Sequence, residues 1–306
     1  MTGFAGSGYC KTTARAGHHT VASGAARDQA PVGLFASRFV LPASHSDAEV
    51  SALQPIRVVL AGATGKVGQV LARALVQEPG FALTGAIARQ GGGRNLAELV
   101  PLGGRPGPTV HGSLEEFLAA GGEADVLVDF SVAEAGRRTI PAAIEASIAP
   151  VVGTTGFQPG ETETWAAMCR KRGLGGAFIA NYAVGIMLLM RFAEEAHRFF
   201  PDVEIIEMHH KTKLDAPSGT ALRTKARLER GRGDLAAAEV PVHSVRLPGL
   251  VAHQEVIFGG LGQTLTIRHD APSREAYVPG VLMTCRWVLR EKRVAFDLEE
   301  VAFPRT

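Results

Sequence analysis

Short apolar runs and longer helical stretches alternate along the middle of the chain. Residues 56–61 form a run with no polar side chain after Arg57, which is typical of a strand buried on both faces of a parallel sheet. The same pattern predicts further strands at 82–88, 125–130, 149–152 and 177–180, and helices at 69–77, 114–119 and 133–146. Because strands and helices alternate, we predict an α/β fold with a doubly wound parallel sheet.

The pattern changes near residue 181. An apolar-rich helix is expected at 186–200 and a strand at 203–208. Three later segments look extended and are divided by Pro-Gly and Gly-Gly pairs, namely 243–247, 252–258 and 263–269. This order predicts a first domain at 55–180 and a smaller α+β domain, with a mixed or antiparallel sheet, at 181–277.

The first 54 residues continue neither pattern. They are rich in Gly, Ala, Ser and Thr, have no acidic residue before Asp28 and show no sustained periodicity. Such a segment is compatible with a targeting peptide, a disordered tail, or upstream sequence included by a wrong start codon. We expect residues 1–54 to be a disordered extension without a catalytic role.

Length and composition exclude several classes of protein. The chain has 306 residues, enough for a large core, and its formal net charge of +2 gives no reason to expect nucleic acid as a partner. Three cysteines lie far apart without CxxC spacing, which argues against a disulfide framework or a zinc site and is typical of a reducing compartment. No apolar run approaches the ~20 residues of a membrane helix. We expect a cytoplasmic protein that uses no metal and binds no membrane.

A glycine-rich turn follows the first expected strand directly. Gly62 permits a tight turn, Gly65 lets the backbone approach a pyrophosphate, and Gly68 allows the next helix to pack closely against the strand. The turn also contains Lys66 and Val67, and its place between a strand and a helix is that of a Rossmann-like dinucleotide site. The alternative is a glycine-rich turn in an α/β protein that binds no nucleotide.

Two further strand ends are expected to line the same crevice. Phe130 ends one strand, and Gly153, Thr154 and Thr155 end the next. The carboxyl ends of parallel strands share one edge of a sheet, which is where such folds bind their ligands. These four residues are therefore candidate cofactor contacts.

The residues after the second expected strand bear on the choice between NADPH and NADH. An acidic residue there would bind the ribose hydroxyls of NADH, but no acid lies between Phe81 and Ala97. Arg89 follows the strand instead, and Arg94 lies near it. We expect a preference for the 2′-phosphate of NADPH, with NADH as a second cofactor. The alternative is a surface arginine on a mobile loop.

Residues 204–222 combine the parts of a site for a small acid: histidines and a lysine after an apolar strand, and then a helix start. These residues are His209, His210, Lys213, Ser218, Gly219 and Thr220. A serine cap leaves the next amide groups free beside an ammonium, and such a helix N-terminus favours a carboxylate. A nearby histidine can donate a proton near neutral pH. The alternative is a polar loop with solvated charges.

The same segment, EIIEMHHKTKLDAPSGTAL, resembles the characteristic motif of the 4-hydroxy-tetrahydrodipicolinate reductase (dihydrodipicolinate reductase) family. The resemblance extends from about Pro55 to the end of the chain. Its further motifs are AGATGKVG at 61–68, VDFS at 128–131, VVGTTGF at 151–157, IANYAVG at 179–185 and a distal block at 243–280. It implies NAD(P)H-dependent reduction of a small cyclic dicarboxylate in lysine and diaminopimelate biosynthesis.

The resemblance also implies roles for individual residues. His209 matches the family's proposed acid, and Lys213 its second catalytic cation. The residues that match positions binding the substrate carboxylates are His210, Lys213, Ser218, Gly219 and Thr220, with Thr155 also reaching the substrate. The nicotinamide is expected near Ala180, Asn181 and Tyr182, although core packing is an alternative for Tyr182. The family pattern further implies a homotetramer and a return of residues 278–306 to the nucleotide domain.

One segment departs from the family pattern. Only residues 222–242 separate the anion-binding turn from the next strand motif, where the family has a full helix and a long connection. Within it, residues 228–239 (LERGRGDLAAAE) look like a poor helix remnant. Three alternatives to the reductase stay open: another amino-acid-pathway dehydrogenase, a related imine reductase with a changed substrate, and a nucleotide-binding homologue without activity.

Overall fold

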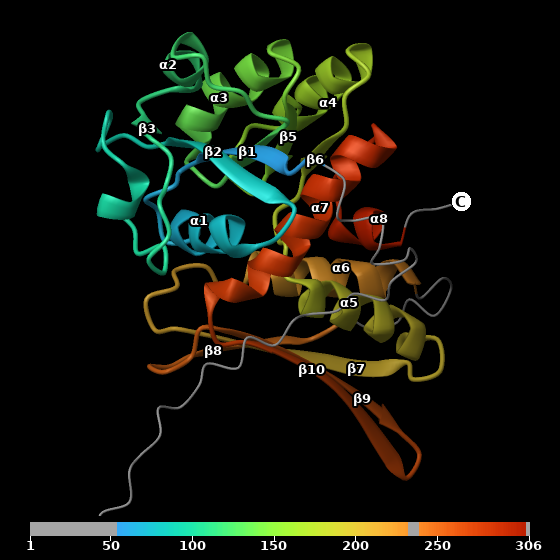
Figure 1. The fold of residues 1–306 in the computed structure, drawn as a ribbon. Coiled ribbons are helices and arrows are strands. Elements are labelled where there is room, and N and C mark those ends of the chain that lie inside the picture. The colour runs from blue at the N-terminus through green and yellow to red at the C-terminus, as the bar shows by residue number, and fades with distance from the viewer. Residues whose placement is uncertain (1–53, 232–238, 304–306) are drawn as a thin grey trace, which may run out of the picture. The chain divides into compact units, whose positions relative to one another are not determined.

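The computed structural model describes residues 54–231 and 239–303, which contain two β-sheets and their helices (Figure 1). The expected N-terminal extension, 1–54, lies outside the described residues except for its last position, and that expectation stays a prediction. Within the described ranges, no helix is both long enough and apolar enough to cross a membrane.

The larger sheet consists of parallel strands in the order β11-β6-β5-β4-β1-β2-β3. Its strands are β1 (Ile56–Ala61), β2 (Phe81–Ile87), β3 (Val110–His111), β4 (Val126–Asp129), β5 (Ala149–Val152), β6 (Gly176–Phe178) and β11 (Val294–Ala295). Helices α2 (Leu114–Ala119), α3 (Ala133–Glu145) and α4 (Glu161–Lys171) cover one face, and α1 (Gly68–Gln77) and α7 (Val278–Glu291) cover the other (Figure 1). The predicted doubly wound, Rossmann-like sheet is confirmed.

The apolar runs form the centre of this sheet because helices cover both of its faces. Val58 and Leu60 of β1 are fully buried in the core on one side, and Val59 is fully buried on the other. Helix α1 buries Leu71 and Leu75, which lie one turn apart and face the sheet. The strands are parallel, so the loops that follow β1, β4 and β5 meet at a single edge.

The sequence gives no bounds for several short or polar elements of this part of the fold. Helix α4 buries only Trp165, Ala166 and Cys169, so its apolar stripe is too narrow to stand out from the sequence. Strands β3 and β11 have two residues each, too few to show a period. Short elements also lie at η2 (Leu96–Glu98), η3 (Arg274–Tyr277) and α8 (Leu298–Ala302).

The smaller sheet has the strand order β10-β9-β7-β8 and is mixed, as predicted. Its strands are β7 (Asp202–His209), β8 (Val242–Arg246), β9 (Ala252–Gly260) and β10 (Gln263–Ala271), and its helices are α5 (Val184–His197) and α6 (Gly219–Gly231). Strand β7 pairs in parallel with β8, whereas β9 is antiparallel to both β7 and β10. The two helices share a hydrophobic core with β7 and β9.

The poor helix remnant predicted at 228–239 falls within the described residues only at 228–231 and 239, and it stays a prediction. Helix α6 continues to Gly231 and buries Ala221 and Leu228 in the core of the smaller sheet. Its residue Arg227 forms ion pairs outside the helix, with Glu194 at 2.6 Å and with Glu299 at 2.7 Å. The rest of the connection, 232–238, lies outside the described residues.

Candidate active site

The turn between β1 and α1 leaves no room for side chains at its first and last glycines. Gly62 has a φ of +77°, and a Cβ there would lie 2.5 Å from the carbonyl oxygen of Phe130. A Cβ on Gly68 would lie 2.0 Å from the carbonyl oxygen of Gly62. Gly65 and Lys66 are exposed, and no side chain caps the N-terminus of α1. This open turn around Lys66 and Val67, which lacks a side-chain cap at the start of α1, fits the pyrophosphate of a dinucleotide.

A buried carboxylate ties the ends of β4 and β5 together. Oδ1 of Asp129 accepts hydrogen bonds from the Thr154 hydroxyl at 2.6 Å and from the Ser131 hydroxyl at 2.7 Å. The Ser131 amide donates to the same oxygen at 2.9 Å. Ser131 also lies against Gly62, so these bonds fix the two strand ends beside the glycine turn.

Phe130, Gly153 and Tyr182 pack together at this edge. A Cβ on Gly153 would lie 2.2 Å from a ring carbon of Phe130, and the Phe130 and Tyr182 ring centroids are 5.6 Å apart. Tyr182 is 1% exposed, and its hydroxyl donates to the carbonyl oxygen of Val152 at 3.0 Å. Its side chain is therefore a core residue, which leaves only its backbone to meet a cofactor.

The two arginines expected near a 2′-phosphate have different surroundings. Nε of Arg94 lies 2.9 Å from Oε2 of Glu98, so its charge has a partner within its own loop. Arg89 is exposed after β2 and forms no ion pair with any residue of 54–231 or 239–303. Of the two, Arg89 is the cation left without a counter-charge.

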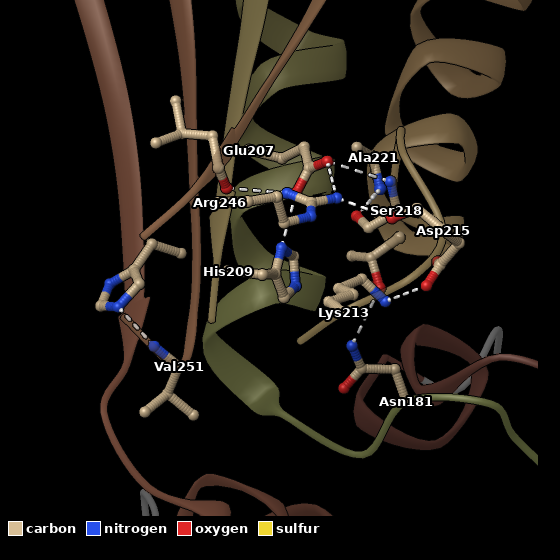
Figure 2. Close-up of polar contacts among 12 residues, drawn as sticks. Asn181, Glu207, His209, Lys213, Asp215, Ser218, Ala221, Arg246 and Val251 are labelled. Atoms are coloured by element: carbon tan, nitrogen blue, oxygen red, sulfur yellow. Dashed lines mark hydrogen bonds and ion pairs between the residues drawn. The ribbon is translucent and has the colours of Figure 1, made fainter. Parts of the chain in front are cut away.

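His209 is held at the end of β7 by a buried carboxylate (Figure 2). Its Nδ1 lies 2.5 Å from Oε2 of Glu207, a residue with no exposed surface. Arg246 lies opposite His209 in the pairing of β7 and β8, and it binds the same carboxylate, that of Glu207. Its Nη1 donates to Oε2 at 2.9 Å and its Nη2 donates to Oε1 at 2.6 Å.

These neighbours act in opposite directions on the pKa of His209. Burial has the largest effect and lowers the pKa, Glu207 raises it, and Lys213 and Arg246 lower it, with a net shift below 6.5. Burial alone would raise the pKa of Glu207, but hydrogen bonds, first of all from Arg246, outweigh it and the net shift is downward. Near neutral pH the ligand-free site therefore combines a carboxylate, a guanidinium and a neutral imidazole.

Lys213 and His210 lie in the turn that links β7 to α6. Nζ of Lys213 is 2.8 Å from Oδ1 of Asp215, and this hydrogen bond is the main cause of a lowered pKa at Asp215 (Figure 2). Nδ1 of His210 is 2.9 Å from the hydroxyl of Thr212. An incoming carboxylate would compete with Asp215 for the lysine ammonium.

Ser218 caps helix α6 in the predicted way. Its Oγ accepts a hydrogen bond from the amide of Ala221 at 3.2 Å, and its own amide donates to Oε1 of Glu207 at 3.2 Å. A Cβ added to Gly219 would meet no atom within 4 Å, so space is open in front of the first helical residue. The helix start is thus both tied to the carboxylate beside His209 and accessible to an anion.

A small cavity brings His209, Ser218 and Thr220 together with Asn181. Asn181 precedes α5, and its Nδ2 donates to the Thr220 hydroxyl at 3.4 Å. The other predicted site residues do not line this cavity: Lys213, His210 and Gly219 lie in the adjoining turn and helix start, and Thr155 and Ala180 are exposed in the loops after β5 and β6.

Sequence reasoning missed the residues that hold His209 and those opposite it. Glu207 shares the core-facing side of β7 with Val203 and Ile205, and a charge at such a position is a signal of a buried ion pair. Its partner Arg246 had no comparable signal. His253 and His269 come from β9 and β10 and line the same cavity, which only the pairing of those strands reveals.

The sheet, the glycine turn and the separate imidazole site define the class, a two-domain oxidoreductase with a Rossmann-like dinucleotide fold. Models of the dihydrodipicolinate reductase N-terminus and C-terminus match residues 56–182 and 185–302, respectively. The chain belongs to the dihydrodipicolinate reductase family.

Known relatives and solved structures agree with this assignment. The chain is 42% identical over 268 residues to the 4-hydroxy-tetrahydrodipicolinate reductase of Thermosynechococcus vestitus, covering 81% of this chain and 97% of the relative. The reductase of Moorella thermoacetica is also 42% identical, with 80% and 97% covered. A dipicolinate-bound dihydrodipicolinate reductase from Paenisporosarcina sp. TG-14 superposes with a TM-score of 0.70 at 33% identity, covering 81% of this chain and 99% of that one. An amine dehydrogenase from Mycobacterium smegmatis shares the fold alone, at 17% identity and a TM-score of 0.55 over 80% and 93% of the two chains.

Proposed function

We propose that the chain is an NAD(P)H-dependent 4-hydroxy-tetrahydrodipicolinate reductase that forms tetrahydrodipicolinate in lysine and diaminopimelate biosynthesis. The observation that supports this most directly is the cavity in which His209 meets the capped start of α6 and Asn181. It combines a titratable proton donor with an anion-binding helix start, as a dicarboxylate requires. Family membership and the dipicolinate-bound neighbour agree with it.

The nucleotide would be held by the glycine turn and the neighbouring strand ends. Gly62, Gly65 and Gly68, with Lys66 and Val67, would take the pyrophosphate at the start of α1. Phe130, Gly153, Thr154 and Thr155 would border the nicotinamide, together with Ala180, Asn181 and the backbone of Tyr182. When bound, the cofactor supplies a hydride. In the absence of an acid after β2, we propose NADPH as the preferred form, with NADH accepted.

The substrate carboxylates would bind at the start of α6. Ser218, Gly219 and Thr220 offer amide and hydroxyl groups, and His210 and Lys213 add donors from the preceding turn. A dianion is costly to remove from water, so several donors and a cation are needed to offset its desolvation. Lys213 would have to exchange its bond with Asp215 for one with the substrate.

His209 and Lys213 are the candidates for the proton that quenches the reduced ring. Hydride addition to C4 of the conjugated C=C–C=N system of dihydrodipicolinate moves negative charge towards the ring nitrogen. The pKa of His209 is lowered in the ligand-free protein, chiefly by burial. A bound dicarboxylate places negative charge nearby and raises that pKa, so substrate binding would bring the proton with it.

The organisation around this reaction is also a proposal. Residues 55–180, with 278–306, would bind the nucleotide, and 181–277 would bind the substrate and assemble a homotetramer in the cytoplasm. The fold supports the division, because β11 pairs with β6 at the edge of the larger sheet while the substrate residues cluster around the smaller one.

The first test is oxidation of NADPH by the full chain, with dihydrodipicolinate generated in place by the preceding synthase. We expect a loss of nicotinamide absorbance that requires the synthase. Lys213→Ala should lower turnover with little effect on NADPH affinity, whereas Lys211→Ala, on the neighbouring exposed lysine, serves as the matched control. Folded protein that binds NADPH but oxidises none would instead indicate a changed substrate or a lost activity.

A further inference from the structure

A carboxylate occupies a core-facing position of β7. Glu207 has no exposed surface and follows Val203 and Ile205 on the buried side of the strand. Burying a charge is costly unless it is paired, and an apolar pair of similar volume is often no less stable than a buried ion pair. Packing alone therefore gives no reason for Glu207 and Arg246 to occupy this site.

Both oxygens of Glu207 are engaged, and they join three elements. Oε1 accepts from Arg246 on β8 and from the amide of Ser218 at the start of α6. Oε2 accepts from Arg246 and lies against Nδ1 of His209 at 2.5 Å (Figure 2). One side chain thus connects the candidate acid to the helix start that would bind the substrate carboxylate.

The geometry fixes which nitrogen of His209 holds the proton. An ionised carboxylate only accepts hydrogen bonds, and the guanidinium of Arg246 keeps Glu207 ionised, so Nδ1 of His209 must be the donor. In the neutral imidazole Nε2 is then the free acceptor, and in the imidazolium Nε2 is the acidic N–H. His209 lines the cavity and Glu207 does not, so the exchangeable proton is on the ligand side.

We propose that Glu207, ionised by Arg246, is a positioning residue that sets the tautomer and orientation of His209 and keeps it basic enough to acquire a proton. This proposal rests on the role assigned to His209 under the proposed function. Five neighbouring groups bear on its protonation. Lys213 and Arg246 oppose it, as do the imidazoles of His253 and His269 when charged, whereas Glu207 favours it. Asp270 pairs with His253 at 2.6 Å, which leaves Glu207 as the carboxylate in contact with His209.

The decisive variant is Glu207→Gln, which keeps the shape and removes the charge. We expect kcat to fall on the order of tenfold to a hundredfold, and the alkaline limb of the kcat profile to move to lower pH, with KM for NADPH unchanged. The matched control is Glu204→Gln on the same strand, because Glu204 also pairs with a histidine of β8, the exposed His243, at 2.8 Å. It should leave kcat and the pH profile as in the wild type.

The single variant leaves Arg246 without its counter-charge, so Glu207→Gln/Arg246→Met is the second test. Removing both charges should restore the melting temperature without restoring kcat or the pH profile. Either variant, if folded with wild-type kcat and an unshifted profile, would overturn the proposal.

The tautomer of His209 can also be measured in the wild-type protein, without a variant and without an activity assay. Side-chain ¹⁵N–¹H correlation spectra should show neutral His209 protonated at Nδ1 and bare at Nε2. The opposite tautomer would refute the positioning role of Glu207 even if the reductase assay succeeds. Conversely, the expected tautomer in a chain that reduces no dihydrodipicolinate would count against the proposed function alone.

Discussion

At the scale of single residues, the candidate binding residues differ in whether they already have partners. Lys213 and Arg94 are each paired with a neighbouring carboxylate, whereas Arg89 is exposed and unpaired within the described residues. A group without a partner can bind a ligand at no cost in broken contacts. Arg89 should therefore contribute to cofactor affinity more than Arg94.

Arg89→Ala should raise KM for NADPH about tenfold and leave KM for NADH nearly unchanged, because only NADPH has the 2′-phosphate that the guanidinium would bind. Steady-state kinetics with both cofactors provides the measurement. Arg94→Ala is the control in the same loop and should change KM for NADPH less. Equal losses with NADPH and NADH in Arg89→Ala would show that the arginine does not recognise the phosphate.

At the scale of elements, the edge of the larger sheet depends on one carboxylate that links two strands. Asp129 ends β4 and binds both Ser131 and Thr154, so it sets the spacing between the turns after β4 and β5. Its other oxygen, Oδ2, is buried and has no hydrogen-bond partner in the described part of the chain. We therefore expect Asp129 to matter chiefly because it holds the turns after β4 and β5, which would border the cofactor, at a fixed spacing.

Asp129→Ala should weaken NADPH binding severalfold and lower the free energy of unfolding by about 1–3 kcal/mol, since the buried hydroxyl of Thr154 loses its shorter hydrogen bond, to Oδ1, and keeps only the one to the carbonyl oxygen of residue 129 at 3.4 Å. Fluorescence titration with NADPH and chemical unfolding measure the two effects. Asp125→Ala is the matched control: Asp125 precedes β4 at its opposite end and pairs with Arg57 at 2.7 Å. The Asp125→Ala variant should lose stability but retain its NADPH affinity. A similar loss of NADPH affinity in both variants would argue against a role for the Asp129 hydrogen bonds in cofactor binding.

At the scale of the whole described chain, distant segments complete both halves of the proposed enzyme. Trp287 and Val288 of α7 are buried in the core of the larger sheet, and β11 extends the sheet beyond β6. The cavity likewise combines Asn181 with residues of α6, β7, β9 and β10. Protonation of histidines inside that cavity therefore affects the stability of the folded chain as well as its chemistry.

The ligand-free protein should lose stability as the pH falls from 7 to 5. Burial is the largest effect on His209 and His269 and lowers both pKa values below the 6.5 of an unfolded chain. At pH values above 6.5 the contribution of these two histidines to the stability of the folded chain is fully present. As the pH falls below 6.5, the unfolded chain binds protons that the folded chain does not, so the free energy of unfolding decreases. The slope is at most about 1.4 kcal/mol per pH unit for each histidine.

Thermal melts at a series of pH values would measure this slope. His269→Gln should reduce it, and added dipicolinate should reduce it further, because a bound dicarboxylate raises the pKa of His209. A melting temperature that rises on acidification would contradict the predicted direction.

The strongly patterned elements were predictable from the sequence because their signals are local. The run 56–61 is β1, the serine before Gly219 caps α6, and Gly68 lies where a side chain would collide with the backbone of Gly62. In each case the cause is a period, a cap or a steric demand that involves residues close in the chain. Local signals are weak at the charged end of α6, where Arg227 forms ion pairs with the distant Glu194 and Glu299.

The sequence by itself thus determined the fold class, the position of the glycine turn and the segment that holds the candidate chemistry. Only the tertiary structure decided which groups meet there. Glu207 pairs with Arg246, 39 positions away, through the register of β7 and β8, and the buried hydroxyl of Tyr182 has its acceptor at Val152, 30 positions away. Partners of buried polar groups are chosen by strand pairing and packing among distant residues, and no local pattern specifies that choice.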